Sequence, residues 1–258
     1  MKRIVLFLTA AIFLMAGGLQ AKDWKTIRMC SEGAYPPFNY MTPEGKLVGF
    51  DIEIGQALCD FLKVECTWQT QDWDGTIPGL LARKYDASIA QMSITEERLK
   101  SVAFSKKYSN SPAKLAAQEN LVISVLSGEQ KKIKIGVQRE TIHDRYATAM
   151  WGKNTEIIRY GTQDEVYLDM KSGRIDLTLA DAVSLSEGFL NLEGNEKFQF
   201  VGPTFSDPKW FGIGTGIAIH KDNQDLVELF NKAIDGIRAN GTYKKIQDKY
   251  FNFDIYGD

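Results

Sequence analysis

The chain has no large excess of charge of either sign and little histidine or cysteine. Its 258 residues include 31 Lys and Arg against 33 Asp and Glu, a net charge of −2, and no Lys/Arg block stands out. Nucleic-acid binding depends on a strong local excess of positive charge, so we expect no nucleic-acid partner. The two histidines, His143 and His220, show no metal-ligand spacing. The sequence therefore predicts no bound metal.

Motifs for phosphate binding and nucleophilic catalysis are also absent. The sequence has no P-loop, no dinucleotide-binding glycine fingerprint and no Gly-x-Ser-x-Gly elbow. We therefore expect no cofactor. An enzyme is not excluded, because a pair of catalytic carboxylates is set by its position in space rather than by its spacing in the sequence.

Long apolar runs are absent after the first 21 residues. Residues 4–15 form an apolar run behind Lys2 and Arg3, and small residues follow it up to Ala21. This pattern predicts a secretory signal peptide at 1–21. The alternative is a membrane-spanning helix, which needs about 20 apolar residues and therefore a longer run. We expect a soluble, exported product.

Cysteine is scarce, with three residues in the chain. Cys59 and Cys66 lie seven positions apart, where a helical pattern gives way to a strand-like one. In the oxidising compartment that export implies, they are a plausible disulfide across a helix-to-strand turn. Cys30 is left over at the end of an apolar run, and we expect it to be a buried free thiol.

Short strand-like runs alternate with amphipathic stretches along the mature chain. The predicted strands are 26–30, 66–70, 87–90, 134–137, 156–160, 177–180 and 213–219. The predicted helices are 51–62, 76–84, 96–101, 141–150, 163–171, 182–190 and 224–250, the last broken near Asn240 and Gly241. Such alternation predicts mainly parallel sheets with helices on both faces. Because the pattern restarts midway, we expect two α/β lobes.

Polar and aromatic residues follow the first three predicted strands, where open α/β sheets bind ligands. These residues are Glu32, Tyr35, Trp73, Gln91, Ser93 and Arg98. Arg98 stands one turn inside a predicted helix and can hold a carboxylate bidentately. Tyr35 and Trp73 could sandwich a long side chain, and a buried Glu32 would need a cationic partner. Each residue alone also fits a structural role, as a helix cap, a solvated face or core packing, but together they favour a zwitterionic ligand.

Several motifs occur together along the chain: Tyr35-x-Pro37-Phe38, Gly49-Phe50-Asp51, Trp73-Asp74, Ser93-Ile94-Thr95-x-x-Arg98, Ser172-Gly173-Arg174-Ile175-Asp176, Ser186-Glu187-Gly188-Phe189-Leu190 and Gly241-Thr242-Tyr243. With them, the mature chain resembles the extracytoplasmic solute-binding proteins that serve ABC importers of polar amino acids. It is especially similar to the lysine/arginine/ornithine- and histidine-binding proteins, with opine-binding relatives. The resemblance covers nearly all of 24–258.

The resemblance implies a periplasmic binding protein-like α/β fold with a ligand cleft between two lobes. The first lobe would comprise 24–111 and 212–258, and the second 112–211. Arg98 would hold the ligand α-carboxylate, helped by Ser93 and by backbone N–H groups near Thr141. Asp181 would take the α-ammonium, Glu32 the cationic side-chain end, and Tyr35 and Trp73 would enclose the aliphatic part.

Two departures from the family pattern concern the pocket. Ala90 and Gln91 stand where lysine/arginine/ornithine binders carry two serines, so we expect Gln91 to contribute its carbonyl and its side chain to alter the pocket floor. Glu140, Thr141 and Ile142 replace the usual Gly-Thr-Thr or Gly-Ser-Thr. Glu140 would repel an anion if it pointed inward.

The resemblance implies a periplasmic, monomeric protein that is not an enzyme. It would bind arginine, lysine, ornithine or histidine, close around it, and deliver it to an inner-membrane ABC permease. The alternatives are opine binding, an exported enzyme similar to cyclohexadienyl dehydratases, and a ligand-sensing module of a receptor.

Overall fold

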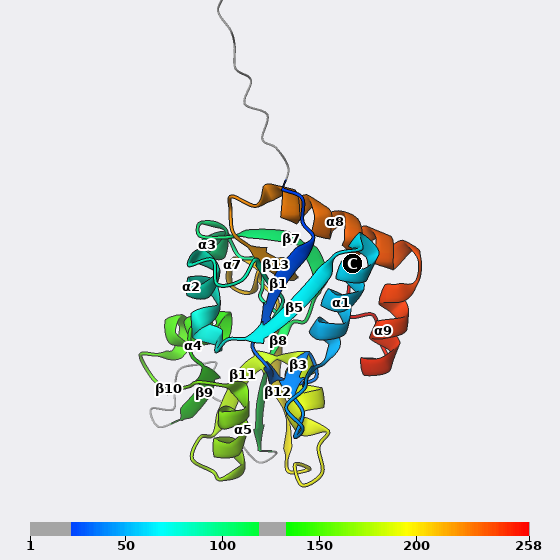
Figure 1. Ribbon diagram of the computed structural model, residues 1–258. Helices are drawn as coiled ribbons and strands as arrows, with labels where there is room; N and C mark the ends of the chain where they lie inside the picture. The colour runs from blue at the N-terminus through cyan, green and yellow to red at the C-terminus, as the bar shows by residue number, and fades with distance from the viewer. Residues whose placement is uncertain (1–21, 119–132, 258) are drawn as a thin grey trace, which may run out of the picture.

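The computed structural model describes residues 22–118 and 133–257, so the predicted signal peptide at 1–21 lies outside the described residues. The described chain forms two lobes, each built on a five-stranded sheet with helices on both faces (Figure 1). The predicted α/β class with two lobes is thereby confirmed. Over the described ranges, no helix is long and apolar enough to cross a membrane.

The first sheet has the strand order β5-β1-β6-β13-β7. Its strands are β1 (Thr26–Ser31), β5 (Glu65–Thr70), β6 (Ala87–Ser88), β7 (Ala103–Ser109) and β13 (Thr215–Ile219). The strand β1 runs parallel to β5 and β6, whereas β13 runs antiparallel to both of its neighbours. The sheet is therefore mainly parallel with one reversed strand.

Helices cover both faces of the first sheet. The first-lobe helices are α1 (Phe50–Leu62), the 3₁₀ turn η1 (Trp73–Gly75), α2 (Thr76–Leu81), α3 (Glu96–Leu99), α8 (Gln224–Ala239) and α9 (Thr242–Tyr250). In one core, Ile54 of α1 and Phe230 of α8 pack with Ile27 of β1. In the core on the α2 side, Leu80 packs with Cys30. The predicted break in the C-terminal helix falls between α8 and α9.

The second sheet has the order β10-β9-β11-β8-β12. Its strands are β8 (Ala113–Gln118), β9 (Lys134–Gln138), β10 (Glu156–Tyr160), β11 (Leu177–Asp181) and β12 (Phe198–Phe205). Its helices are α4 (Ile142–Trp151), α5 (Gln163–Lys171), α6 (Ala182–Leu185), the π-helical turn η3 (Ser186–Leu190) and α7 (Pro208–Phe211). The strands β10, β9 and β11 are parallel, and β8 is the reversed strand here.

Some elements were not predicted from the sequence. A separate three-stranded sheet joins β2 (Ala34–Tyr35), β3 (Asn39–Met41) and β4 (Leu47–Val48). Strands of two or three residues are too short to show a period of two. The strands β7, β8 and β12 were also missed. The helix predicted at 182–190 changes from α-helical to π-helical hydrogen bonding after Leu185.

The chain crosses between the lobes twice, from β7 to β8 and from α7 to β13. The strand that follows each crossing is the reversed strand of its sheet. Gly212, in the second crossing, has φ +79°, and a Cβ there would lie 2.4 Å from the carbonyl oxygen of Ile94. Glycine is required at this position because the backbone of the first lobe passes so closely.

The predicted disulfide joins Cys59 at the end of α1 to Cys66 in β5, with Cα atoms 6.2 Å apart. Cys30 is a free, fully buried thiol, as expected. The disulfide therefore fastens a helix to the edge strand of the first sheet.

Replacing Cys59 and Cys66 together with Ser should lower the free energy of unfolding by about 2–3 kcal/mol, because the cross-link restricts the unfolded chain. Urea titration monitored by circular dichroism measures this change. A reductant should bring the wild type to the level of the double variant and leave that variant unchanged. A wild type that is insensitive to reductant would contradict the prediction.

Candidate functional site

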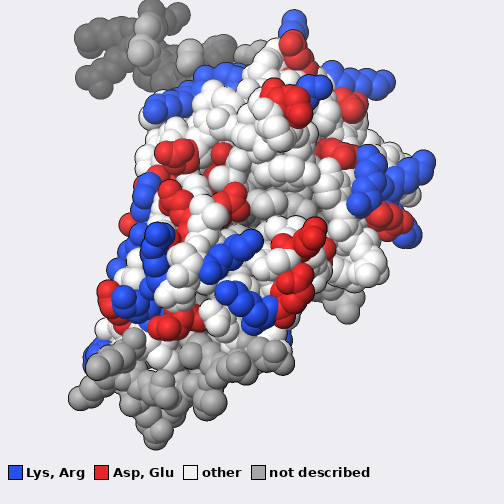
Figure 2. Space-filling model, turned by 90° about the horizontal axis from the view of Figure 1, so that it is seen from below, with Lys and Arg blue, Asp and Glu red and all other residues white. Residues whose placement is uncertain are grey.

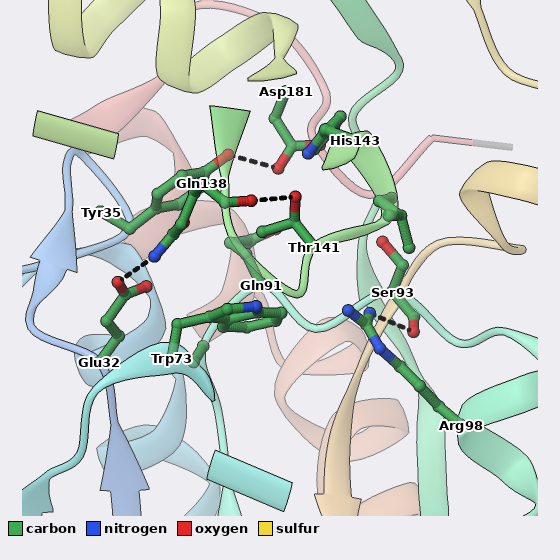
Figure 3. A pocket seen from close by; sticks show the side chains of 12 residues that line it. Glu32, Tyr35, Trp73, Gln91, Ser93, Arg98, Gln138, Thr141, His143 and Asp181 are labelled. Atoms are coloured by element: carbon green, nitrogen blue, oxygen red, sulfur yellow. Dashed lines mark hydrogen bonds and ion pairs between the residues drawn. The ribbon is translucent and has the colours of Figure 1, made fainter. Parts of the chain in front are cut away.

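One pocket lies between the two lobes and contains all eight side chains that the sequence predicted for a ligand site (Figure 3). The first lobe contributes Glu32, Tyr35, Trp73, Ala90, Gln91, Ser93 and Arg98. The second contributes Gln138, Thr141, Ile142, His143 and Asp181. The geometry brings the predicted residues together, while their contact with a ligand stays a prediction.

The topology explains why these residues meet. Glu32 follows β1 directly, Gln138 and Asp181 end β9 and β11, and the loop after β6 carries Gln91. The carboxyl ends of parallel strands lie at the same edge of a sheet, which makes that edge the usual ligand site. Here the two sheets present these edges to one another.

Glu32 is a buried carboxylate, 8% exposed, in the part of the pocket opposite Arg98 (Figure 3). Its Oε1 accepts a hydrogen bond of 2.6 Å from Nε2 of Gln138, across the lobe boundary. Burial raises the pKa of Glu32 to about 7, more than the bond from Gln138 lowers it, and the negative charge of Asp164 adds to the rise. Within the described residues no Lys or Arg forms an ion pair with it.

Asp181 is a second buried carboxylate, 6% exposed, at the end of β11. Its Oδ2 accepts a 2.8 Å hydrogen bond from the Tyr35 hydroxyl of the other lobe. Burial raises the pKa of Asp181 to about 7, although the Tyr35 bond and the charge of Arg98 both act to lower it. Its Oδ1 lies 3.8 Å from Nε2 of His143, too far for a hydrogen bond.

Arg98 is a buried cation in α3, 8% exposed. Its Nη1 donates to the carbonyl oxygen of Ser93 at 3.0 Å, and its guanidinium carbon lies 5.2 Å from the centre of the Trp73 ring. Burial lowers its pKa to about 10, with the charge of Arg145 adding to the effect. In the part of the chain that the structure describes, no carboxylate forms an ion pair with it.

The helix starts beside the pocket are capped by threonine. Thr95 accepts a hydrogen bond from the backbone N–H of Arg98 and so fixes the turn that carries it. Thr141 accepts from the N–H of Asp144 and donates to the carbonyl oxygen of Gln138. Capping therefore engages the Thr141 hydroxyl, and that the first-turn N–H groups of α4 contact a ligand stays a prediction.

Gln91 has its side-chain amide engaged inside the first lobe. Its Nε2 donates to Asp51 at 2.7 Å, and its Oε1 accepts from Ser109 at 3.0 Å. Gln91 also takes a left-handed backbone conformation, with φ +49°. This side chain therefore ties the pocket floor to α1 and to the end of β7. That its carbonyl contacts a ligand stays a prediction.

Glu140, which would repel an anion if it pointed inward, is exposed and does not line this pocket; it lines a neighbouring one, which also includes Trp73 and Arg98. It takes φ +59°, the left-handed conformation that a glycine adopts without cost. The turn before α4 thus has the backbone conformation that a glycine at this position would favour.

Gln138 and His143 line the pocket but were not predicted, and Ala90 and Ile142 were named only as departures from the family pattern. Gln138 directly follows the predicted strand 134–137, and His143 stands two residues after Thr141. In the first lobe, polar residues at the ends of predicted strands are candidate ligand contacts. The same criterion would have identified Gln138 in the second lobe. Over the described ranges, no group of His, Cys, Asp or Glu side chains is arranged to hold a metal ion.

Ion pairs join the lobes at the rim of the pocket. Nε of Arg139 lies 2.6 Å from Oδ2 of Asp74, and Arg145 pairs with Glu97. All four side chains are partly exposed to solvent. The lobes therefore touch through rim ion pairs as well as through the bonds inside the pocket. On the face shown in Figure 2, acidic and basic side chains of the described residues are mixed rather than gathered by sign.

Comparisons with known proteins identify relatives over the full length of the chain. The chain matches the model of the bacterial extracellular solute-binding proteins, family 3, over residues 27–253. It is 45% identical over 258 residues to an L-arginine-binding protein of Pseudomonas aeruginosa, covering 100% of this chain and 99% of that one. It is 38% identical over 260 residues to a lysine/arginine/ornithine-binding periplasmic protein of Escherichia coli, with both chains fully covered.

A solved structure is similar as well. A Salmonella typhimurium periplasmic binding protein, described as highly specific for arginine, superposes with a TM-score of 0.81 at 28% identity, covering 88% of this chain and 100% of that one. The resemblance seen in the sequence motifs is thereby confirmed. Because the family model matches most of its length and its relatives match it from end to end, this chain belongs to the bacterial extracellular solute-binding proteins of family 3.

Proposed function

We propose that the pocket binds a basic L-amino acid, arginine foremost, and delivers it to the permease of an ABC importer. One observation carries the proposal: the pocket contains one cation, Arg98, and two carboxylates, Glu32 and Asp181, each at most 8% exposed. Within the described residues, none of the three has an ion-pair partner of opposite charge; Nε2 of His143, whose imidazole is neutral, lies 3.8 Å from Asp181. Buried charges without partners are costly, so a ligand of complementary charge is the economical explanation.

A basic amino acid has the required complement of charges. Its α-carboxylate matches Arg98, its α-ammonium matches Asp181, and its cationic side-chain end matches Glu32. An aliphatic amino acid would leave Glu32 unpaired, and an acidic one would bring a second anion towards it. An opine derived from arginine would add a further carboxylate, for which the pocket offers no second cation among the residues that line it.

Arginine fits the surroundings of Glu32 better than lysine does. Asp72, Asp74 and Asp164 all raise the pKa of Glu32, so the ligand's cationic end enters a region of negative potential. Gln138 adds an amide beside the Glu32 carboxylate. A planar guanidinium with five N–H donors can engage several acceptors at once, whereas an ammonium has three. Of the three relatives reported above, two are described as binding arginine and the third as binding lysine, arginine and ornithine.

We infer that ligand binding closes the pocket between two lobes. The first lobe comprises residues 24–111 and 212–258, and the second comprises residues 112–211. The bonds from Tyr35 to Asp181 and from Gln138 to Glu32 both cross between the lobes. A ligand held by Arg98 in one lobe and Asp181 in the other favours the form in which both are in reach. In this proposal the product is exported by its signal peptide, and the permease recognises the closed, monomeric form.

Calorimetry across the amino acids tests the proposal. Arginine, lysine, ornithine and histidine should bind, with arginine the tightest, while leucine and glutamate should bind far more weakly. Small-angle scattering should show a smaller radius of gyration when arginine is saturating. A preference for an acidic or aliphatic ligand would overturn the proposal, and turnover of prephenate or arogenate would replace it with an enzymatic function.

A further inference from the structure

His143 is a buried histidine in the pocket with no role so far. It lies in the first turn of α4, 5% exposed, and its ring is 6.1 Å from the ring of Phe211. It lines the same pocket as Arg98 and Asp181, the two residues that the proposed function assigns to the ligand α-carboxylate and α-ammonium. Figure 3 shows the imidazole beside the Asp181 carboxyl group.

The Nε2 atom of His143 has no hydrogen-bond partner among the described residues, although it is buried. Buried polar atoms are nearly always hydrogen-bonded, and leaving one unpaired costs stability. The nearest acidic group, Oδ1 of Asp181, lies 3.8 Å away. Nε2 of His143 and Oδ1 of Asp181 thus border the same part of the pocket, and no hydrogen bond joins them.

The imidazole is neutral in this setting. Burial lowers the pKa of His143 to about 3, and the positive charge of Arg98 adds to the effect. A neutral imidazole carries its proton on one nitrogen and offers the other as an acceptor. With the proton on Nδ1, Nε2 presents a lone pair to the pocket.

We propose that Nε2 of His143 accepts a hydrogen bond from the ligand α-ammonium, as a second acceptor beside Oδ1 of Asp181. Two atoms 3.8 Å apart can both lie about 2.9 Å from a nitrogen placed between them. An α-ammonium has three N–H donors, so Asp181 alone leaves some of them unpaired. The inference rests on the proposed function and makes His143 a residue that selects for the α-amine.

The proposal predicts a different change in arginine affinity for each of three variants. The variant His143→Phe keeps an aromatic ring and removes the acceptor, whereas His143→Gln keeps a carbonyl acceptor at a similar reach. His143→Phe should weaken arginine binding roughly ten-fold or more, since a hydrogen bond from a charged donor is lost. His143→Gln should stay within a few-fold of the wild type. The matched control His220→Phe removes the other histidine, which lies outside the pocket lining, and should bind as the wild type does.

Two arginine analogues identify the ligand group that His143 contacts. Agmatine lacks the carboxylate, and 5-guanidinopentanoate lacks the α-amine. The loss in His143→Phe should persist for agmatine and disappear for 5-guanidinopentanoate, measured by calorimetry or by competition with labelled arginine. The melting temperature of the ligand-free variant should equal or exceed that of the wild type, because an unpaired buried polar atom has been removed.

Several outcomes would overturn the inference. Wild-type affinity of His143→Phe for arginine would remove His143 from ligand recognition. A loss for 5-guanidinopentanoate but not agmatine would mean that Nε2 donates to the carboxylate instead. Equal losses for all three ligands, with a lower melting temperature and no rescue by His143→Gln, would assign a structural role. If the wild type bound no basic amino acid, the proposed function would fail, independently of these comparisons.

Discussion

Replacing Glu32 with Gln should weaken the binding of arginine and lysine by about 2–5 kcal/mol and change the order of preference among ligands. Truncating one partner of a buried charge pair costs this much, largely because the other charge is left without compensation. Glu32 is the buried carboxylate in the acidic part of the pocket, next to Gln138. A ligand with a neutral side chain of similar length, such as citrulline, should lose little affinity.

The same substitution should reduce the pH dependence of binding. In the ligand-free protein the pKa of Glu32 is raised to about 7 by burial. A bound cation favours the ionised carboxylate, so affinity for arginine should be highest above pH 7 and should decline as pH falls below it. Asp181 has its pKa raised to about 7 for the same reason and contributes likewise. Glu32→Gln should therefore leave a shallower decline rather than none.

As pH rises, the stability of the ligand-free protein should decrease while its affinity for arginine increases. A carboxyl group whose folded-state pKa lies above its unfolded value binds more protons when folded, so stability declines as pH rises between those values. For Glu32 that window runs from the ordinary glutamate pKa of 4.5 to about 7. Ligand-free Glu32→Gln should thus melt at a higher temperature than the wild type above pH 7. Calorimetry measures the affinity and thermal unfolding measures the stability, both from pH 5 to about 8.5. If Glu32→Gln left the order of preference among ligands unchanged, that result would contradict the assignment of Glu32 to the cationic end of the ligand.

The residues of the first lobe show why part of the site could be predicted. Glu32 and Gln91 each follow a strand whose pattern the sequence displays, and parallel strands place such residues at one edge. The motif resemblance then added Thr141 and Asp181 from the second lobe. Gln138 ends β9 and meets the same strand-end rule in the second lobe, although no family motif marked it.

Other features depend on three-dimensional contacts that no local pattern encodes. That Nε2 of His143 lacks a partner is a property of its surroundings in the folded chain. The amide of Gln91 turns away to bond Asp51 and Ser109, residues 40 and 18 positions away. The strands β2 to β4 pair across turns but are too short to show alternation. These are the places where tertiary packing, rather than periodicity, determines the structure.

Replacing Arg98 with Ala should weaken every ligand that has an α-carboxylate, by about 3 kcal/mol or more, without changing the order of preference among side chains. The pocket lining contains no second Lys or Arg among the described residues, so no other cation compensates the buried carboxylate. Arg98→Lys should recover part of the loss, since it keeps the charge but not the planar pair of donors. The ligand-free variant should remain folded, because Arg98 has no ion-pair partner to leave unpaired.

Agmatine provides the decisive control for Arg98. It retains the guanidinium and the amine of arginine but has no carboxylate, so Arg98→Ala should leave its affinity unchanged or improve it by removing a like charge from the pocket. The carboxylate contribution is then the difference between the arginine and agmatine losses, measured by calorimetry in one buffer at one pH. Arg98 also donates to the carbonyl oxygen of Ser93 and lies against Trp73, so the control must separate carboxylate recognition from a structural effect. Such an effect would weaken agmatine as much as arginine, and that result would contradict the assignment of Arg98 to the carboxylate.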